Sequence, residues 1–533
     1  MDDSTEKTRL RVHEMRIAVQ APASGFRPDD LADVLCGVLA DWEAAPLLED
    51  DDTLWLISGH VEEQIGTGEY ARKAHSLVQA VLGTGTVTRA EADLPVTAFV
   101  DPARDRGAAS DAPGFPPGSE ASRWARDAIR CDEAWAIEPT RGDGIRIGHP
   151  DTGYTLHPNL GVDALDLTRD RDFLANDDDA RDPLVSPDDS PWPLPFPGHG
   201  TTTASVMTGQ GTEATGIVGV APGARVVPLR AVESVIQLFD SDVARAVDHA
   251  RTTGCHVVSI SVGGKGFFGL EAAIQRAVDA GMIVLGAAGN NVGIVVAPAS
   301  YPNCLAVAAT GPDDQPWPES SRGRAVDVSA PGWGVHVAGY VWVNDTPRAR
   351  VFRSSGTSYA VTHLAGVAAL WLAHHGPDTL RERYGPRVQS VFLTLLKTGG
   401  AKVPAGWDSA AFGAGIVDAA AMLSAALPAE SAADRRAGVP QASALARLGA
   451  LVGADEAQLR HALTERLGMT GEDLDRAVER FEGELAFHLI DEPLFRESLL
   501  GEAAGDLMSF TAPATCSPEF ALAFLGAAPE GQC

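Results

Sequence analysis

Four short segments of the chain each carry a side chain that can take part in covalent catalysis. In chain order these side chains are Asp151 in IRIGHPDTG, His199 in GHGTTTASVMTG, Asn290 in MIVLGAAGNN and Ser358 in SSGTSYAVTHLAGVAALWL. A serine nucleophile needs a base, the base needs an orienting carboxylate, and a developing oxyanion needs a donor such as an amide. The four segments together meet each of these needs once.

Each segment alone has an ordinary structural explanation, because aspartate, asparagine and serine are common at turns and helix starts. Their positions are more informative. Asp151 and Asn290 follow apolar strand-like runs, whereas His199 and Ser358 begin apolar helices. Strand ends and helix starts meet at the carboxyl edge of a parallel sheet, so we expect the four side chains to gather there. His149 is close to the acid, but we expect it to point away from the site.

The elements that would position these side chains lie in residues 122–425. Nearly continuous apolar runs, such as CHVVSIS and MIVLGAA, alternate there with amphipathic helices. Such alternation is typical of an α/β fold with a mainly parallel sheet, and continuously apolar strands indicate helices on both faces. We predict this α/β fold for the region, with a small α+β domain before it and a small helical domain after it.

Residues 1–100 are predicted to form the α+β domain, with the order β-α-β-α-β. The expected elements are a helix over 31–42, a strand over 53–58, a helix over 67–82 and strands within 86–100. These follow from helical spacing of apolar residues and from short apolar runs. Residues 101–121 are rich in Gly, Pro, Ala and Ser and are predicted to be a linker.

The last region, 439–533, is predicted to be helical. Its clearest signal is one apolar helix face formed by Leu474, Val478, Phe481 and Leu485. The region has no motif that we can assign, and a protein partner is the role we consider for it.

The composition argues against two classes of partner. The 42 basic and 72 acidic residues give a formal net charge of −30, which repels nucleic acids and anionic membranes. No apolar run is long enough to span a bilayer, and the charged first residues do not resemble a secretory leader. The six cysteines are scattered without metal-ligand spacing, so we predict reduced thiols and a cytoplasmic location.

The four segments resemble the signature motifs of the subtilisin family of serine peptidases. The resemblance runs from WARDAIRCDEAW (124–135) to FGAGIVDAAAML (412–423) and includes SISVGG (259–264) and VDVSAPG (326–332). It implies that Ser358 is the nucleophile, that His199 is the general base, and that Asp151 orients the imidazole. The Asn290 amide and the Ser358 backbone N–H would form the oxyanion hole of a serine endopeptidase.

The resemblance also implies how a protein or peptide substrate would bind. Ser261, Val262 and Gly263 would pair with it as an added strand, beside Ala288 and Gly289. No cofactor or metal is expected for catalysis. The chain departs from the family pattern at a few positions that carry no catalytic group, namely Pro150, Thr202, Tyr359 and Thr362.

Three questions stay open at this point. With its catalytic groups intact the chain is expected to be active, and the alternative is a catalytically silent peptide-binding scaffold. The insert 171–183 carries Asp177, Asp178, Asp179 and Asp182, which form either a solvated acidic loop, our preferred interpretation, or a structural calcium site. Residues 1–100 resemble the family's inhibitory pro-domains only in position and in rough β/α order, and the alternative is a permanent regulatory or partner-binding domain.

Overall fold

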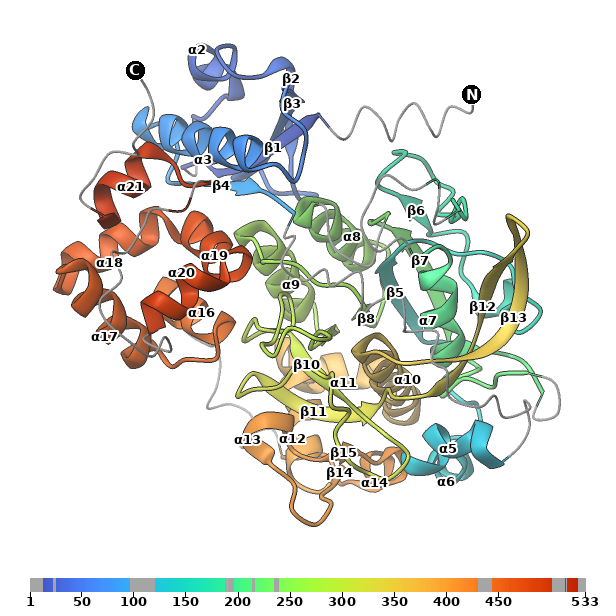
Figure 1. The fold of residues 1–533 in the computed structure, drawn as a ribbon. Coiled ribbons are helices and arrows are strands. Elements are labelled where there is room, and N and C mark those ends of the chain that lie inside the picture. The colour runs from blue at the N-terminus through green and yellow to red at the C-terminus, as the bar shows by residue number, and fades with distance from the viewer. Residues whose placement is uncertain are drawn as a thin grey trace.

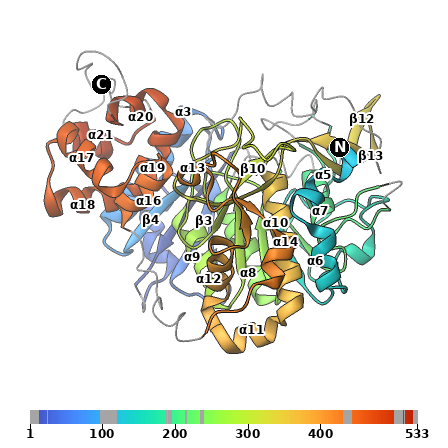
Figure 2. The same cartoon turned by 90° about the horizontal axis from the view of Figure 1, so that it is seen from below.

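The computed structural model describes residues 13–22, 25–95, 120–186, 189, 196–212, 216–233, 239–429, 443–500, 513 and 515–525. Figure 1 shows an N-terminal sheet with its helices (blue), a large central part (cyan to orange) and a C-terminal group of helices (red). Figures 1 and 2 place the N-terminal and C-terminal parts side by side on one flank of the central part. None of the described helices is both long and apolar enough to cross a membrane.

The central part is built on a nine-stranded sheet with the order β14-β15-β11-β10-β9-β8-β5-β7-β6. The strands are β5 (Arg146–Asp151), β6 (Arg171–Asp172), β7 (Arg225–Arg230), β8 (Val257–Ile260), β9 (Ile283–Ala287), β10 (Leu305–Thr310), β11 (Val326–Pro331), β14 (Ala401–Lys402) and β15 (Ile416–Val417). All neighbours pair in parallel except β14 and β15. The mainly parallel sheet predicted from the apolar runs is therefore confirmed.

Helices cover both faces of this sheet because alternate residues of each strand point to opposite sides. Ile283 of β9 packs in the core with α10 (Thr357–His375) and α12 (Val388–Lys397). The next residue, Val284, packs in the other core with α8 (Asp240–Thr252) and α9 (Phe268–Asp279). Every residue of β8, β9 and β10 is buried, which explains why these strands are apolar throughout.

The N-terminal part is a four-stranded antiparallel sheet with the order β2-β3-β1-β4. Its elements are β1 (Glu14–Gln20), α2 (Ala32–Leu35), β2 (Ala40–Pro46), β3 (Leu54–His60), α3 (Gly68–Gly83) and β4 (Arg89–Asp93). The prediction of a single helix over 31–42 was wrong. The helix ends at Leu35, and residues from Ala40 onward pair with β3, so interstrand bonds replace the helical ones. The element order is therefore β-α-β-β-α-β.

Every described element of the C-terminal part is a helix. They are α16 (Ala444–Leu451), α17 (Glu456–Leu467), α18 (Gly471–Arg480), α19 (Glu482–Asp491), α20 (Pro493–Leu500) and α21 (Pro518–Leu525). The predicted apolar face lies in their common core, which includes Leu474, Val478, Phe481 and Leu485. Residues 101–119 of the predicted linker, 101–121, and residues 430–442 lie outside the described residues, and the last two linker residues begin the helix α5 (Glu120–Ala128).

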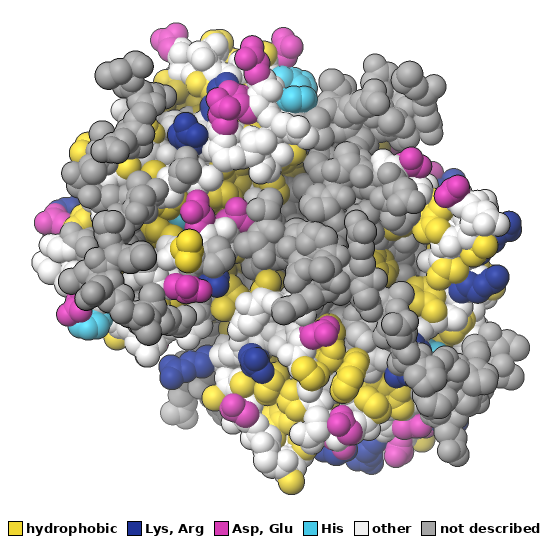
Figure 3. All heavy atoms as spheres, in the orientation of Figure 1, with side chains coloured by type: hydrophobic (Ala, Val, Ile, Leu, Met, Phe, Trp, Pro, Cys, Tyr) yellow, Lys and Arg dark blue, Asp and Glu magenta, His cyan; other side chains and the backbone are white. Residues whose placement is uncertain are grey.

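Acidic side chains are spread over the surface of the protein. On the face drawn in Figure 3, acidic side chains lie over all three described parts rather than in one patch.

The five described cysteines are free thiols, and all but Cys36 are buried. Burial raises the pKa of Cys255 to about 12 and that of Cys516 to about 11, which makes these thiols unreactive at neutral pH.

Candidate active site

Three neighbouring strands and two helices bring the predicted side chains to one edge of the sheet. Asp151 is the last residue of β5, and Asn290 follows β9. Strand β8 lies between these two strands, and Ser261 follows its last residue. His199 begins α7 (His199–Thr208), and Ser358 is the second residue of α10. The predicted side chains therefore lie together at the carboxyl edge of the sheet.

Asp151 and His199 form a buried hydrogen-bonded pair. The two side chains are 0% and 5% exposed, and His199 Nδ1 lies 2.7 Å from Asp151 Oδ1. The Thr152 backbone N–H donates to the same carboxylate oxygen at 2.7 Å. Burial alone would raise the pKa of Asp151, but the imidazole and the N–H lower it below its usual value. The acid is thus ionised at neutral pH, accepts the Nδ1 proton and leaves His199 Nε2 as the basic nitrogen.

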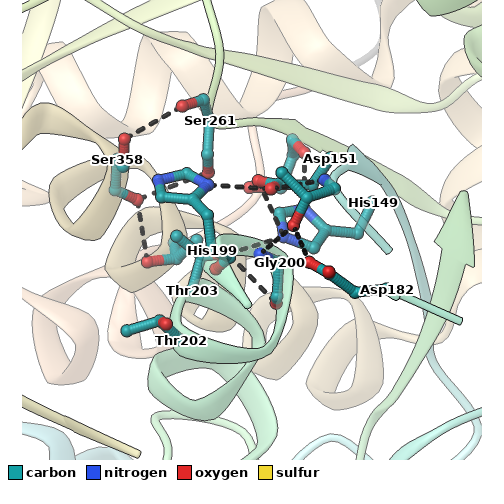
Figure 4. A network of polar contacts seen from close by, with 12 residues as sticks. His149, Asp151, Asp182, His199, Gly200, Thr202, Thr203, Ser261 and Ser358 are labelled. Atoms are coloured by element: carbon teal, nitrogen blue, oxygen red, sulfur yellow. Dashed lines mark hydrogen bonds and ion pairs between the residues drawn. The ribbon is translucent and has the colours of Figure 1, made fainter. Parts of the chain in front are cut away.

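Ser358 lies on the other side of the imidazole. Figure 4 shows the His199 ring between Asp151 and Ser358. The Ser358 hydroxyl donates to the backbone oxygen of Ser261 at 2.9 Å. Catalytic hydrogen bonds are often loose before substrate arrives, and rotation about one bond redirects this hydroxyl. The serine is buried to 8% exposure, at the positive end of the helix α10.

Asn290 is fixed by its side-chain oxygen, which leaves its amide nitrogen for another acceptor. Its Oδ1 accepts hydrogen bonds from the Thr357 backbone N–H and from the Thr357 hydroxyl, both at 2.9 Å. The Thr357 hydroxyl also accepts a bond from the backbone N–H of Gly289 at 3.1 Å. Thr357 therefore orients the carboxamide, a role that the sequence alone did not indicate.

The five predicted substrate-contacting residues lie after β8 and β9. Val262 and Ala288 are buried, and both backbone polar groups of Ala288 are bonded within the protein, to Val307 and Val296, so Ala288 offers no free hydrogen-bonding group to a substrate. Gly289 has φ of +107°, and a Cβ there would come within 3.0 Å of Ser321 and Val296. A Cβ at Gly263 would come within 2.5 Å of Val296. Both positions therefore need glycine for packing, and both are partly exposed.

His149 is a site residue that the sequence reasoning placed wrongly. Its Nε2 lies 3.4 Å from Asp151 Oδ2 and 2.8 Å from the hydroxyl of Thr203, and its Nδ1 donates to Ser259 O at 2.9 Å. The error was in the use of strand alternation, because residues two apart on a strand share a face. That rule, applied to His149 and Asp151, would have found this contact.

The acidic insert contributes a structural carboxylate to the site. Asp182 is buried and accepts bonds from the Thr152 hydroxyl at 2.7 Å and from the Gly198 backbone N–H at 2.8 Å. It thereby joins the turn after Asp151 to the residue before His199. Asp178 is exposed and pairs with Arg171, and no three acidic side chains gather among the described residues of the insert. Calcium binding stays the alternative to the preferred interpretation of a solvated loop.

Comparison with known proteins shows the family of the chain. The profile of the subtilase family matches residues 142–407. The chain is 34% identical to thermitase of Thermoactinomyces vulgaris, over 46% of this chain and 81% of thermitase. It is 35% identical to a thermophilic serine proteinase of Bacillus sp. strain AK1, over 47% of this chain and 57% of that protein. The solved structure of MycP1 from Mycobacterium smegmatis aligns with 26% identity and a TM-score of 0.46, over 59% of this chain and 88% of that one. The chain therefore belongs to the subtilase family and is a subtilisin-like serine endopeptidase.

Proposed function

We propose that Asp151, His199 and Ser358 are the catalytic triad of this peptidase. The observation that carries the proposal is the buried 2.7 Å contact between Asp151 and His199, with Ser358 on the far side of the ring. His199 Nε2 takes the hydroxyl proton as Ser358 attacks the scissile carbonyl, and the imidazolium then protonates the leaving amine. Water then attacks the acyl-enzyme while His199 Nε2 takes its proton, and the imidazolium returns a proton to the Ser358 oxygen as the acyl group leaves.

The oxyanion of the tetrahedral intermediate is proposed to bind the Asn290 side-chain amide and the Ser358 backbone N–H. The support for Asn290 is that Thr357 holds its oxygen, so the NH2 group is oriented before substrate binds. Donors that are already oriented stabilise the transition state without reorganisation. Extended substrate would lie along Ser261 to Gly263 and beside Ala288 and Gly289.

Covalent labelling separates this proposal from the alternative of a silent peptide-binding scaffold. A fluorophosphonate probe reacts only with a serine whose proton is removed by a base. We expect stoichiometric labelling of the intact chain at Ser358 after release of any inhibition, and mass spectrometry of the labelled peptide identifies the residue. An unlabelled protein, or a label on another serine, contradicts the triad.

We also propose that the N-terminal part restrains the enzyme, and its docking contacts support this. Strand β4 presents two carboxylates to the starts of two helices of the central part. Asp93 accepts from the backbone N–H groups of Asp240 and Ser241 at 2.8 and 3.1 Å, where α8 begins. Glu91 accepts from the backbone N–H of Phe268 at the start of α9, at 3.2 Å. Both carboxylates face the positive ends of helix dipoles, which favours docking.

Two ion pairs add to this interface. The Lys265 ammonium donates to Glu91 at 2.8 Å, and both side chains are buried. Arg16 of β1 donates to Asp242 of α8 at 2.9 Å. The helices α8 and α9 precede and follow β8, after which the proposed substrate strand begins. The chain therefore leaves β4 close to this segment. Residues 95–100, which we propose as the inhibitory tail, follow β4, and 96–100 lie outside the described residues.

Cutting the linker is expected to activate the enzyme. A specific protease site placed within 101–121 would convert a tethered inhibitor, held at an effective concentration of about 1 mM, into a free one. After cleavage and dilution to nanomolar concentration, we expect peptidase activity to rise by more than about 100-fold, because a freed domain of modest affinity dissociates at that concentration. Activity is measured with a chromogenic peptide before and after cleavage.

A substitution in the interface between the N-terminal and central parts tests the same proposal without cleavage. Asp93→Asn weakens the cap of α8 and should raise the activity of the uncut chain, whereas Asp33→Asn, at an exposed position in the same part, should not. If cutting leaves the activity unchanged, and added residues 1–100 inhibit nothing, the N-terminal part has another role.

The cytoplasmic location stays a prediction, as does the absence of nucleic-acid and membrane partners.

The C-terminal helices already have an intramolecular partner. Arg447 of α16 pairs with Glu482 at 2.6 Å and lies 3.8 Å from Glu271 of α9. Glu482 also pairs with Arg89 of the N-terminal sheet at 2.6 Å. An external partner for this part, as predicted from the sequence, would use a different surface and stays a prediction.

A further inference from the structure

A buried cluster of two histidines and a glutamate lies where the N-terminal and C-terminal parts meet. His75 comes from α3, and Glu484 and His488 come from α19. The three residues are 3%, 5% and 0% exposed. One ring nitrogen of each histidine and one carboxylate oxygen all lie within 4.8 Å of one another. Figures 1 and 2 show the two parts side by side at this position.

Hydrogen bonds fix the protonation of both imidazoles. His75 Nδ1 lies 3.3 Å from the Thr515 carbonyl oxygen, which can only accept, so Nδ1 carries the proton. The Thr515 hydroxyl donates to Glu492 at 2.7 Å, so it accepts from His488 Nδ1, which lies 3.3 Å away. Each Nε2 atom is thus a bare lone pair.

These two lone pairs have no hydrogen-bond donor. Nε2 of His75 and Nε2 of His488 are both buried without a partner among the described residues. Buried acceptors that are left unpaired destabilise a fold, so such atoms need an explanation. Metal-binding histidines usually donate the second ring N–H to a carbonyl or a hydroxyl, as these two do to Thr515.

The carboxylate of Glu484 is oriented toward the same place. It accepts bonds from the Ser517 backbone N–H at 2.6 Å and from the Ser517 hydroxyl at 2.8 Å. Its Oε1 lies 3.7 Å from His488 Nε2, whereas the His75 nitrogen that it approaches, at 3.9 Å, is the protonated Nδ1, so His75 has to rotate before its Nε2 can join the site. No lysine or arginine in the described part of the chain pairs with this buried carboxylate. A cation in the cluster would supply the missing positive charge.

We propose that His75, Glu484 and His488 bind a divalent transition-metal ion of the Zn²⁺ class. Two imidazoles and one carboxylate suit Zn²⁺, whereas Ca²⁺ and Mg²⁺ require mostly oxygen ligands. A small rearrangement is needed to bring the ligand atoms to bonding distance, and water would fill the fourth position. Because the ligands come from two parts of the molecule, the ion would join the N-terminal sheet to the C-terminal helices.

The test measures metal binding directly in the full chain. The protein carries Ser358→Ala to prevent self-digestion, is stripped with EDTA, and is titrated with Zn²⁺ by calorimetry. We expect one tight equivalent, and Co²⁺ substitution should give the strong visible absorption of a four-coordinate site. At 100-fold excess over Kd the melting temperature should rise by about 3 °C.

Substitutions assign the ligands. His75→Gln and His488→Gln should each weaken Zn²⁺ binding by more than about 100-fold, since the loss of mere outer-shell contacts already costs 10- to 100-fold. His461→Gln is the matched control, because His461 and Glu465 are also four residues apart on a helix of the same part but are exposed. It should leave the affinity unchanged.

Each remaining outcome is decisive. If the histidine variants do not fold, Glu484→Gln, which keeps an oxygen for Ser517, should fold and lose the tight equivalent. The proposal is overturned if the parent protein binds no equivalent of Zn²⁺ or shows no four-coordinate Co²⁺ spectrum. It is also overturned if binding survives in the cluster variants or is lost equally in His461→Gln, because the ion would then occupy another site.

Discussion

Ser358→Ala lowers kcat/KM on a peptide substrate by about 10⁶-fold, the size of loss that follows removal of the subtilisin nucleophile. The reason is that covalent catalysis ends when the attacking oxygen is absent, while His199 and Asp151 keep their contact. Activity should be measured on the chain cut within 101–121, so that the proposed inhibition by the N-terminal part does not hide the effect.

The same variant should remain folded. It loses one hydrogen bond, from Ser358 to Ser261 O, which is worth about 1 kcal/mol. Ser390→Ala, at an exposed serine of α12, is the control and should change neither activity nor melting temperature. More than trace cleavage of casein by the Ser358→Ala protein, once contaminating peptidases are excluded, would refute the proposed nucleophile.

Asn290→Ala lowers kcat by about 100- to 1000-fold, the range found when one oxyanion-hole donor is removed. KM should change little, because the amide acts on the oxyanion of the transition state rather than on the ground-state carbonyl. Steady-state kinetics on the cut enzyme separate the two constants. Asn303→Ala is the matched control, since Asn303 donates to Glu271 O at 3.3 Å, outside the site.

A companion variant tests how the amide is held. Thr357→Val removes the hydroxyl that bonds Asn290 Oδ1 but keeps the backbone N–H bond to the same oxygen. It should give a smaller loss of kcat than Asn290→Ala, again with little change in KM. If Asn290→Ala raised KM by the same factor by which it lowers kcat, Asn290 would instead bind the substrate, and other donors would bind the oxyanion.

Local patterns in the sequence were sufficient to find the chemical groups and the element on which each lies. An apolar run ending at Asp151 predicted the strand β5, and apolar helices beginning at His199 and Ser358 predicted α7 and α10. These patterns work because burial on both sheet faces requires continuous apolar strands, whatever the partner elements are. One error was also local: His149 needed only the correct use of strand alternation.

The helix predicted over 31–42 failed for a different reason. Its apolar residues fit helical spacing, but Ala40–Pro46 gains interstrand hydrogen bonds with β3. Periodicity describes one segment at a time, whereas pairing depends on a strand that lies elsewhere in the chain. A short apolar run can satisfy either structure, and the tertiary contacts decide between them.

The sequence by itself determined the fold class and the four catalytic candidates of this protein. Only the tertiary structure showed that Thr357 orients Asn290, that Asp93 caps α8, and that His75 meets the C-terminal helices. His75 and Thr515 touch although 440 residues separate them. Such contacts form because docked surfaces must satisfy each other's buried polar groups, and no segment contains that information alone.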